Sequence, residues 1–165
     1  MKKLYSLLTA LLIAATIVGC SEDSEELSSG TYDATYSITN LGDIPTYAHI
    51  YVTYTGDYGY TISEEEIFNF PWLYTASDVM SESITMTITF KKKSPFNLEL
   101  DEGVSVDSMA PFDISMEYGV SYTDTVYGTM RSQSITEEAE IDNATDFEAY
   151  IDTLAESPLS ITIVP

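Results

Sequence analysis

The chain has 165 residues, of which 27 are acidic and six are basic, and its formal net charge at pH 7 is −21. A field of that sign repels phosphate backbones and anionic lipid head groups, so the charge excludes nucleic acid as a partner and excludes electrostatic attachment to membranes. Cys20 is the only cysteine, which excludes an intrachain disulfide and leaves stabilisation to the core.

Residues 1–20 have the pattern of an export signal. Lys2 and Lys3 form a short basic region, and residues 7–18 are apolar apart from two threonines. This apolar run is too short to cross a bilayer as a helix. We therefore predict a cleavable signal peptide, whose loss leaves four basic residues against 27 acidic ones and a formal charge of −23.

The end of this signal, Ile17-Val18-Gly19-Cys20, resembles a bacterial lipobox. The resemblance implies that residues 1–19 are the signal peptide, that cleavage occurs before Cys20, and that the Cys20 sulfur carries diacylglycerol. Two or three acyl chains on one cysteine hold a protein firmly on a membrane. The protein would thus reach its membrane through an N-terminal lipid.

The residues after Cys20 are polar, acidic and small, so residues 20–30 are expected to be a flexible tether. The sequence SEDSEE at residues 21–26 resembles the acidic surface-export signal of Bacteroidetes lipoproteins. That resemblance implies a lipid-anchored protein of the outer membrane, displayed on the cell surface. A solubilising linker on a lipoprotein that faces the periplasm is the alternative.

Residues 31–165 are predicted to form a single β-rich domain. Apolar and polar residues alternate with a period of two, which is typical of strands with one buried face. The alternation predicts strands at residues 31–39, 48–55, 83–90, 112–123 and 159–163. Weaker patterns predict further strands at residues 59–63, 97–100 and 125–131.

One helix is expected before the last strand. Phe147, Tyr150, Ile151 and Leu154 recur at helical spacing, and Pro158 would end the helix. Thr145 and Glu148 have the spacing of a capping box, which places the N-cap at Thr145. Roughly seven to nine strands with one late helix indicate an all-β fold, an antiparallel β-sandwich. A calycin-like β-barrel is the alternative, and only the barrel would enclose a ligand cavity.

The densest aromatic segment is FNFPWLY at residues 68–74, which contains the only tryptophan. Phe70, Trp72 and Tyr74 are the candidate ligand contacts, because aromatic faces exposed on a sandwich can stack on sugar rings. In the alternative interpretation, Phe68, Phe70 and Trp72 pack beneath a crossing loop and close one end of the sandwich.

No motif of the chain predicts catalysis or a cofactor, and we expect neither an enzyme nor a metal site. His49, the only histidine, falls in the polar phase of a predicted strand and is expected to be exposed. Acidic groups at residues 101–107 and 142–146 lack EF-hand spacing and are interpreted as solvated turns. Lys91-Lys92-Lys93 is interpreted as a charged segment that protects a strand edge from pairing.

The sequence therefore predicts a non-enzymatic, lipid-anchored protein that binds or presents a ligand at the cell surface, as an accessory to glycan uptake. Two alternatives stay open. One is a β-barrel carrier of a small apolar ligand. The other is a structural or adhesion protein whose acidic coat acts through a surface protein partner.

Overall fold

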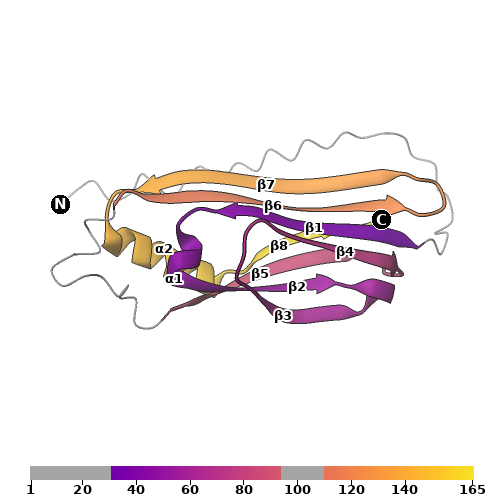
Figure 1. Ribbon diagram of the computed structural model, residues 1–165, viewed down its shortest axis with the longest axis horizontal. Helices are drawn as coiled ribbons and strands as arrows, with labels where there is room; N and C mark the ends of the chain where they lie inside the picture. The colour runs from indigo at the N-terminus through magenta and orange to yellow at the C-terminus, as the bar shows by residue number, and fades with distance from the viewer. Residues whose placement is uncertain (1–30, 94–109) are drawn as a thin grey trace.

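The computed structural model describes residues 31–93 and 110–165, which form two four-stranded antiparallel sheets (Figure 1). One sheet has the order β4-β1-β6-β7 and the other has the order β3-β2-β5-β8. Cys20, the tether, the strand predicted at residues 97–100 and the acidic group at residues 101–107 lie outside the described residues. The strands are β1 (Tyr32–Leu41), β2 (Ala48–Thr55), β3 (Thr61–Ile67), β4 (Trp72–Val79), β5 (Ile84–Lys92), β6 (Phe112–Asp124), β7 (Met130–Ile141) and β8 (Leu159–Ile163).

The two sheets pack face to face, which confirms the predicted β-sandwich. The described strands form two separate sheets that do not close into a barrel, so the calycin-like alternative is wrong. A carrier function that depended on an enclosed barrel cavity loses its structural basis. Short helices connect the strands: α1 (Ile44–Tyr47), the 3-10 turn η1 (Asp57–Gly59) and α2 (Ala144–Glu156).

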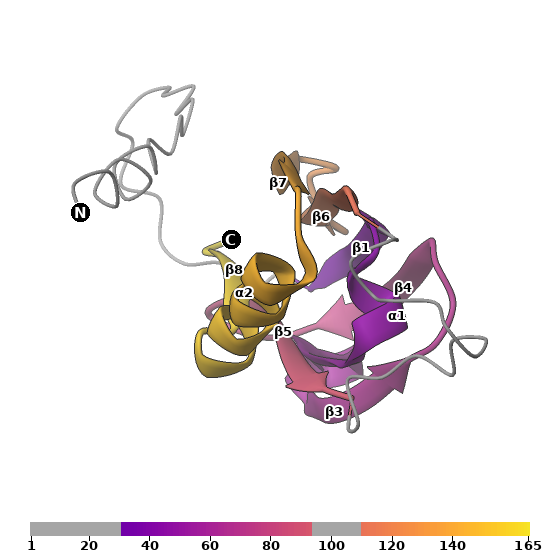
Figure 2. The same ribbon diagram turned by 90° about the vertical axis from the view of Figure 1, so that its left-hand side faces the viewer.

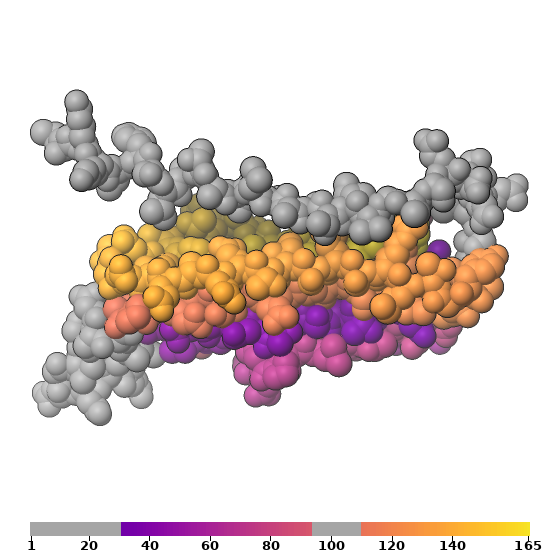
Figure 3. Space-filling model, turned by 90° about the horizontal axis from the view of Figure 1, so that it is seen from above, coloured from indigo at the N-terminus to yellow at the C-terminus, as the bar shows by residue number. Residues whose placement is uncertain are grey.

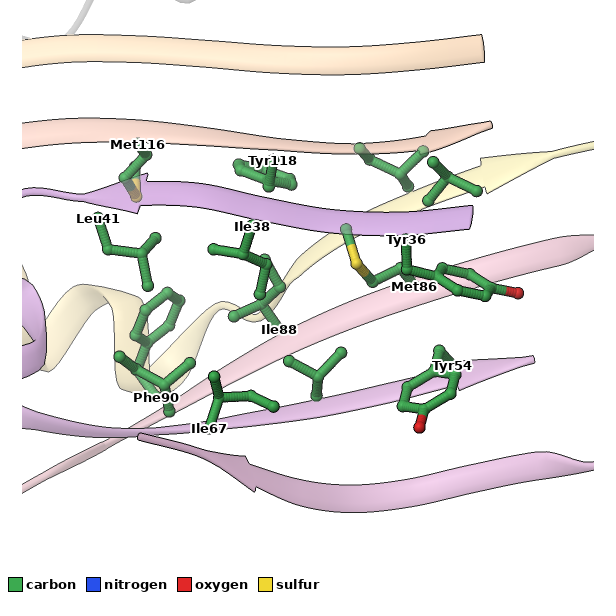
Figure 4. Close-up of a cluster of buried hydrophobic side chains, with 14 of the residues drawn as sticks. Tyr36, Ile38, Leu41, Tyr54, Ile67, Met86, Ile88, Phe90, Met116 and Tyr118 are labelled. Atoms are coloured by element: carbon green, nitrogen blue, oxygen red, sulfur yellow. The ribbon is translucent and has the colours of Figure 1, made fainter. Parts of the chain in front are cut away.

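The core lies between the sheets and follows the predicted alternation. Ile84, Met86, Ile88 and Phe90 of β5 are each at most 1% exposed. Figure 4 shows Met86, Ile88 and Phe90 facing residues of β1 and β6 from the opposite sheet. Tyr36 brings a hydroxyl into this core and donates it to the carbonyl oxygen of Thr55, so burial does not leave the phenol unpaired.

Helix α2 packs on the β8 side of the sandwich, away from β3 and β4 (Figure 2). Its apolar face is the predicted one: Phe147, Ile151 and Leu154 are buried, and Phe147 stacks on Phe112 with ring centroids 4.4 Å apart. The predicted N-cap was wrong. Asn143 caps the helix, because its Oδ1 accepts the backbone N–H of Asp146. This cap also accounts for the polar cluster at residues 142–146.

Lys91 and Lys92 end β5, and Lys93 follows it. Strand β2 pairs with β5 as far as Lys92, whereas the pairing with β8 stops at Ile88. The lysines therefore come after the part of β5 that β8 covers, and their protection of that edge stays a prediction. Lys92 donates its ammonium group to Glu148 and Asp152 of α2, and Lys93 donates to the carbonyl oxygen of Pro45 in α1 at 2.7 Å. The ammonium group of Lys91 lies 4.2 Å from the ring centroid of Tyr51. The lysines therefore connect the end of β5 to both helices.

Two edge strands, β4 and β7, differ from the prediction made from the sequence. The weak strand expected at residues 125–131 is mostly a turn, and β7 begins only at Met130. Most of β7 is exposed on both faces, so the strand lacks the apolar phase that alternation needs. Strand β4 was not predicted at all, although its residues include the candidate contacts Trp72 and Tyr74.

A matched pair of methionines tests this arrangement. Met86 is fully buried in β5, whereas Met130 at the start of β7 is 68% exposed. We expect Met86→Ala to lower the free energy of unfolding by about 2–5 kcal/mol, because it leaves a cavity between the sheets. Met130→Ala should change that free energy by less than about 0.5 kcal/mol. Urea denaturation of both variants measures the difference, and equal losses would contradict the interior position of β5.

Candidate functional site

Trp72 and Tyr74 occupy the inward face of β4, an edge strand of its sheet. In the β1–β4 register, Trp72 lies opposite Ile38 and Tyr74 lies opposite Tyr36. Directly opposed residues point to the same face of an antiparallel pair. Because Ile38 and Tyr36 are fully buried, the two β4 rings point toward the second sheet rather than away from the molecule.

The rings of β4 meet a tyrosine of the opposite sheet. Tyr54 of β2 lies 5.6 Å from Trp72 and 4.7 Å from Tyr74, measured between ring centroids. Trp72 and Tyr74 are nearly parallel, with an angle of 11° between their planes and 6.5 Å between their centroids. Figure 4 places Tyr54 near Tyr36 between the sheets. We call Tyr54, Trp72 and Tyr74 the aromatic edge.

Strands β3 and β4 are terminal strands on the same side of the sandwich (Figure 1). The aromatic edge closes this side. Tyr54 is 3% exposed, whereas Trp72 and Tyr74 are half-buried. A sandwich without disulfides must cover its open sides with side chains, and large rings remove the most apolar area from water. Trp72 therefore packs against the core, as the packing interpretation predicts, but it closes the side between β3 and β4 rather than one end beneath a crossing loop. Part of each β4 ring is still accessible.

Glu65 supplies a carboxylate to this group. It lies opposite the buried Val52 in the β2–β3 register and is itself exposed. Its Oε2 accepts the Tyr54 hydroxyl at 2.6 Å. The preceding residue, Glu64, has φ of 53° at the irregular part of β3, and its backbone N–H donates to Oγ1 of Thr53 at 3.1 Å.

These surroundings raise the pKa of three tyrosines. For Tyr54 the main cause of the raised pKa is burial, followed by the hydrogen bond and the charge of Glu65. Burial also raises the pKa of Tyr74, with smaller contributions from the charges of Asp57 and Glu65. Burial raises the pKa of Tyr36 as well. The aromatic edge is thus a neutral, hydroxyl-bearing surface beside an exposed carboxylate.

The other residues of the aromatic segment have different environments. Phe70 is half-buried against the core, whereas Phe68 is 75% exposed and Leu73 is 68% exposed. Phe68 therefore does not take part in closing the sandwich, contrary to the packing interpretation. Leu73 points outward because it alternates with Trp72 and Tyr74 along β4.

Sequence reasoning missed Tyr54 and Glu65 as members of the site. In the sequence, Tyr54 has the pattern of an ordinary core residue of an alternating strand. Glu65 is one of 27 acidic residues, and nothing around it distinguishes it from the others. No local signal joins Tyr54 or Glu65 to Trp72. Together the aromatic edge and Glu65 can hold the apolar face of a sugar ring on Trp72 and Tyr74 and accept a sugar hydroxyl at the carboxylate.

His49 lies on the outer face, away from this group. Its side chain is 45% exposed and its Nδ1 lies 2.8 Å from Oε1 of Glu66, which confirms the predicted exposure. Across residues 31–93 and 110–165, no three His, Cys, Asp or Glu side chains are arranged to hold a metal ion. Within the same ranges, no helix has the length and hydrophobicity needed to span a membrane.

Comparisons of the chain with protein-family models, with curated proteins and with solved structures found no match.

The Tyr54–Glu65 contact has a consequence at alkaline pH. In the unfolded chain a tyrosine ionises near pH 10, whereas the pKa of Tyr54 is raised in the fold. The stabilisation that corresponds to this shift is complete below about pH 10 and is lost as the pH rises through the folded-state pKa. Glu65→Gln removes a carboxylate, so we expect Tyr54 to ionise at a lower pH in that variant.

An ultraviolet absorbance titration of tyrosinate measures this change. Tyr54→Phe identifies the contribution of Tyr54 to the titration curve of the parent protein. Glu66→Gln is the matched control, because Glu66 contacts His49 on the opposite face of β3. Identical curves for Glu65→Gln and Glu66→Gln would contradict the contact.

Proposed function

We propose that this protein is a non-enzymatic, lipid-anchored lipoprotein of the outer membrane that binds a glycan at the cell surface through the aromatic edge. The observation that carries the proposal is the nearly parallel, half-buried pair Trp72 and Tyr74 beside the exposed carboxylate of Glu65. Glycan uptake by other surface proteins is the process that such an accessory would serve.

The packing of the rings favours recognition. Trp72 and Tyr74 are held by Tyr54, Tyr36 and the β1–β4 pairing, so little side-chain entropy would be lost when a sugar binds. Aromatic side chains also provide a large contact area for few rotatable bonds. A surface of this kind suits a repeating ligand such as a polysaccharide, because each ring can stack on a different sugar unit.

The negative charge of the chain disfavours anionic glycans as ligands. The 27 acidic residues give the protein a negative field, and Asp57 and Glu65 add to that field near Tyr74. Like charges at close range disfavour an anionic polymer. Neutral polysaccharides are therefore the proposed ligands, with Glu65 accepting a hydroxyl.

Calorimetric titration of the full chain with neutral polysaccharides tests this function. Trp72→Phe preserves much of the packing that Trp72→Ala would remove, so it separates binding from stability. We expect Trp72→Phe and Glu65→Gln each to weaken binding by about tenfold, which corresponds to about 1.4 kcal/mol. Phe68→Ala is the control, because Phe68 is a more exposed aromatic residue outside the aromatic edge. Unchanged affinity in both Trp72→Phe and Glu65→Gln, or no binding by any neutral polysaccharide, would reject the proposal.

The anchor has its own test. We expect the full chain to fractionate with membranes and to be released by Cys20→Ser, because the resemblance at residues 17–20 puts the lipid on that sulfur. Ser21→Ala is the control, since it leaves Cys20 in place. Membrane fractionation followed by immunoblotting measures the distribution. Retention of Cys20→Ser in the membrane fraction would contradict the anchor.

A further inference from the structure

Exposed apolar side chains gather at one end of the sandwich. Eight of the ten large hydrophobic side chains that the described residues expose lie at the end where Thr31 begins the domain. Seven of these, all except Ile62 of β3, lie in or beside the turns and the C-terminal residues at that end. They come from the turns after β2, β4 and β6, from the first residue of β7 and from the C-terminal residues. We call this group the apolar tip: Tyr58, Tyr60, Met80, Val126, Tyr127 and Met130, with Val164 beside them.

Thr31 is bound directly to the apolar tip. The backbone N–H of Thr125 donates to the carbonyl oxygen of Thr31 at 3.0 Å, and the Thr125 hydroxyl donates to the same oxygen at 2.8 Å. Val126 and Tyr127 follow immediately in the β6–β7 turn. Figure 3 shows this turn projecting at one end of an elongated body. The polypeptide that leads back to Cys20 therefore leaves the domain next to the exposed rings.

The separate turns of the tip contact one another. The backbone N–H of Ser77 donates to Oδ1 of Asp57 at 2.7 Å. Gly59 has φ of 82°, and a Cβ there would lie 2.5 Å from the carbonyl oxygen of Met80. The turns after β2 and β4 are thus closely packed against each other. Strand β1 then connects them to the β6–β7 turn, because it pairs with both β4 and β6.

Two acidic residues at this end, Asp57 and Asp124, accept hydrogen bonds from backbone N–H groups. Oδ1 of Asp124 accepts the backbone N–H groups of Val126 and Tyr127 at 2.7 and 2.9 Å, and Asp57 accepts the bond from Ser77. Asp78 and Glu82 add negative charge, against the single positive charge of Arg131. A surface that is apolar and acidic suits a neutral, zwitterionic lipid interface and disfavours an anionic one.

We propose that the apolar tip rests on the bilayer that holds Cys20, with Tyr58, Tyr60 and Tyr127 at the level of the head groups. The inference rests on the acylation of Cys20 that the proposed function includes. Residues 20–30 reach at most about 40 Å when fully extended, and a strand as long as β6 spans about as much. Because the tether joins the domain at Thr31, this end always lies within the reach of the tether, whereas the opposite end can lie about twice as far from the anchor.

Docking at this end needs little intrinsic affinity. A short tether holds the domain at an effective concentration of about millimolar near the lipid, so weak contacts suffice. Tyrosine is enriched at membrane interfaces because its ring is apolar and its hydroxyl is solvated. Docking by the tip would direct the strands away from the bilayer and leave the aromatic edge on the side of the sandwich accessible to a glycan.

Quenching by brominated lipid tests the docking. The acylated full chain, carrying Trp72→Phe, is reconstituted in phosphatidylcholine vesicles with brominated acyl chains. A single new tryptophan is introduced by Tyr127→Trp at the tip or by Phe68→Trp as a control. These rings are similarly exposed, at 72% and 75%. Because tryptophan settles at the interface, we expect the Tyr127→Trp signal to fall about twofold or more and the Phe68→Trp signal to be unchanged.

The outcomes separate docking from anchoring. Flotation of the chain with the vesicles reports the anchor independently, and Cys20→Ser should not float. A chain that floats without selective quenching of Tyr127→Trp overturns the docking and leaves the anchor intact, whereas failure to float overturns both. Tyr60→Trp provides a second tip position if Tyr127→Trp has a lowered melting temperature. Phosphatidylglycerol in the vesicles should reduce the quenching, and an increase would contradict the role given to the acidic residues.

Discussion

Closure of the two open sides of the sandwich by aromatic packing is the constraint on which the other features depend. Cys20 is the only cysteine, so no intrachain disulfide can join the sheets. On the β8 side, Phe147 of α2 stacks on Phe112. On the β3–β4 side, Trp72 and Tyr74 pack against Tyr54. Two sheets with one apolar face each are thereby joined into a single core without a covalent link.

The same packing links stability to the proposed recognition. Trp72 and Tyr74 are accessible because β4 is an edge strand, and they are rigid because their inward faces lie against the second sheet. A residue that both closes a core and contacts a ligand must meet two requirements. Packing in the core limits its size, and ligand contact requires a suitable exposed face. Truncating such a residue changes stability and binding together, and conservative substitutions are needed to separate the two.

The position of Thr31 distinguishes the two ends of the sandwich, because the chain from Cys20 enters the domain at one of them. The bonds between Thr31 and Thr125 place the start of the domain beside the turns that carry the exposed tyrosines. The helices α1 and α2 begin at the opposite end, where Lys92 of β5 and the following Lys93 connect them to the sheet. In the proposed arrangement one end faces lipid, while the aromatic edge runs along a side. Anchoring and recognition then use separate surfaces and do not compete.

The amino-acid sequence by itself determined the buried phase of β1, β2, β5, β6 and β8, the apolar face of α2 and the all-β class, because hydrophobic period is a local property. A sandwich and a barrel share that period, so the choice between them came from the two separate sheets of the structure. The sequence also selected Trp72 and Tyr74 as candidates. The order of the strands in the two sheets decided which of these residues contact one another. The inward orientation of Trp72, its contact with Tyr54, the carboxylate of Glu65 and the interior place of β5 all depend on which strands become neighbours. Thr31 and Thr125 meet across 94 residues of chain, a contact that local patterning does not encode, since it follows from register between distant strands.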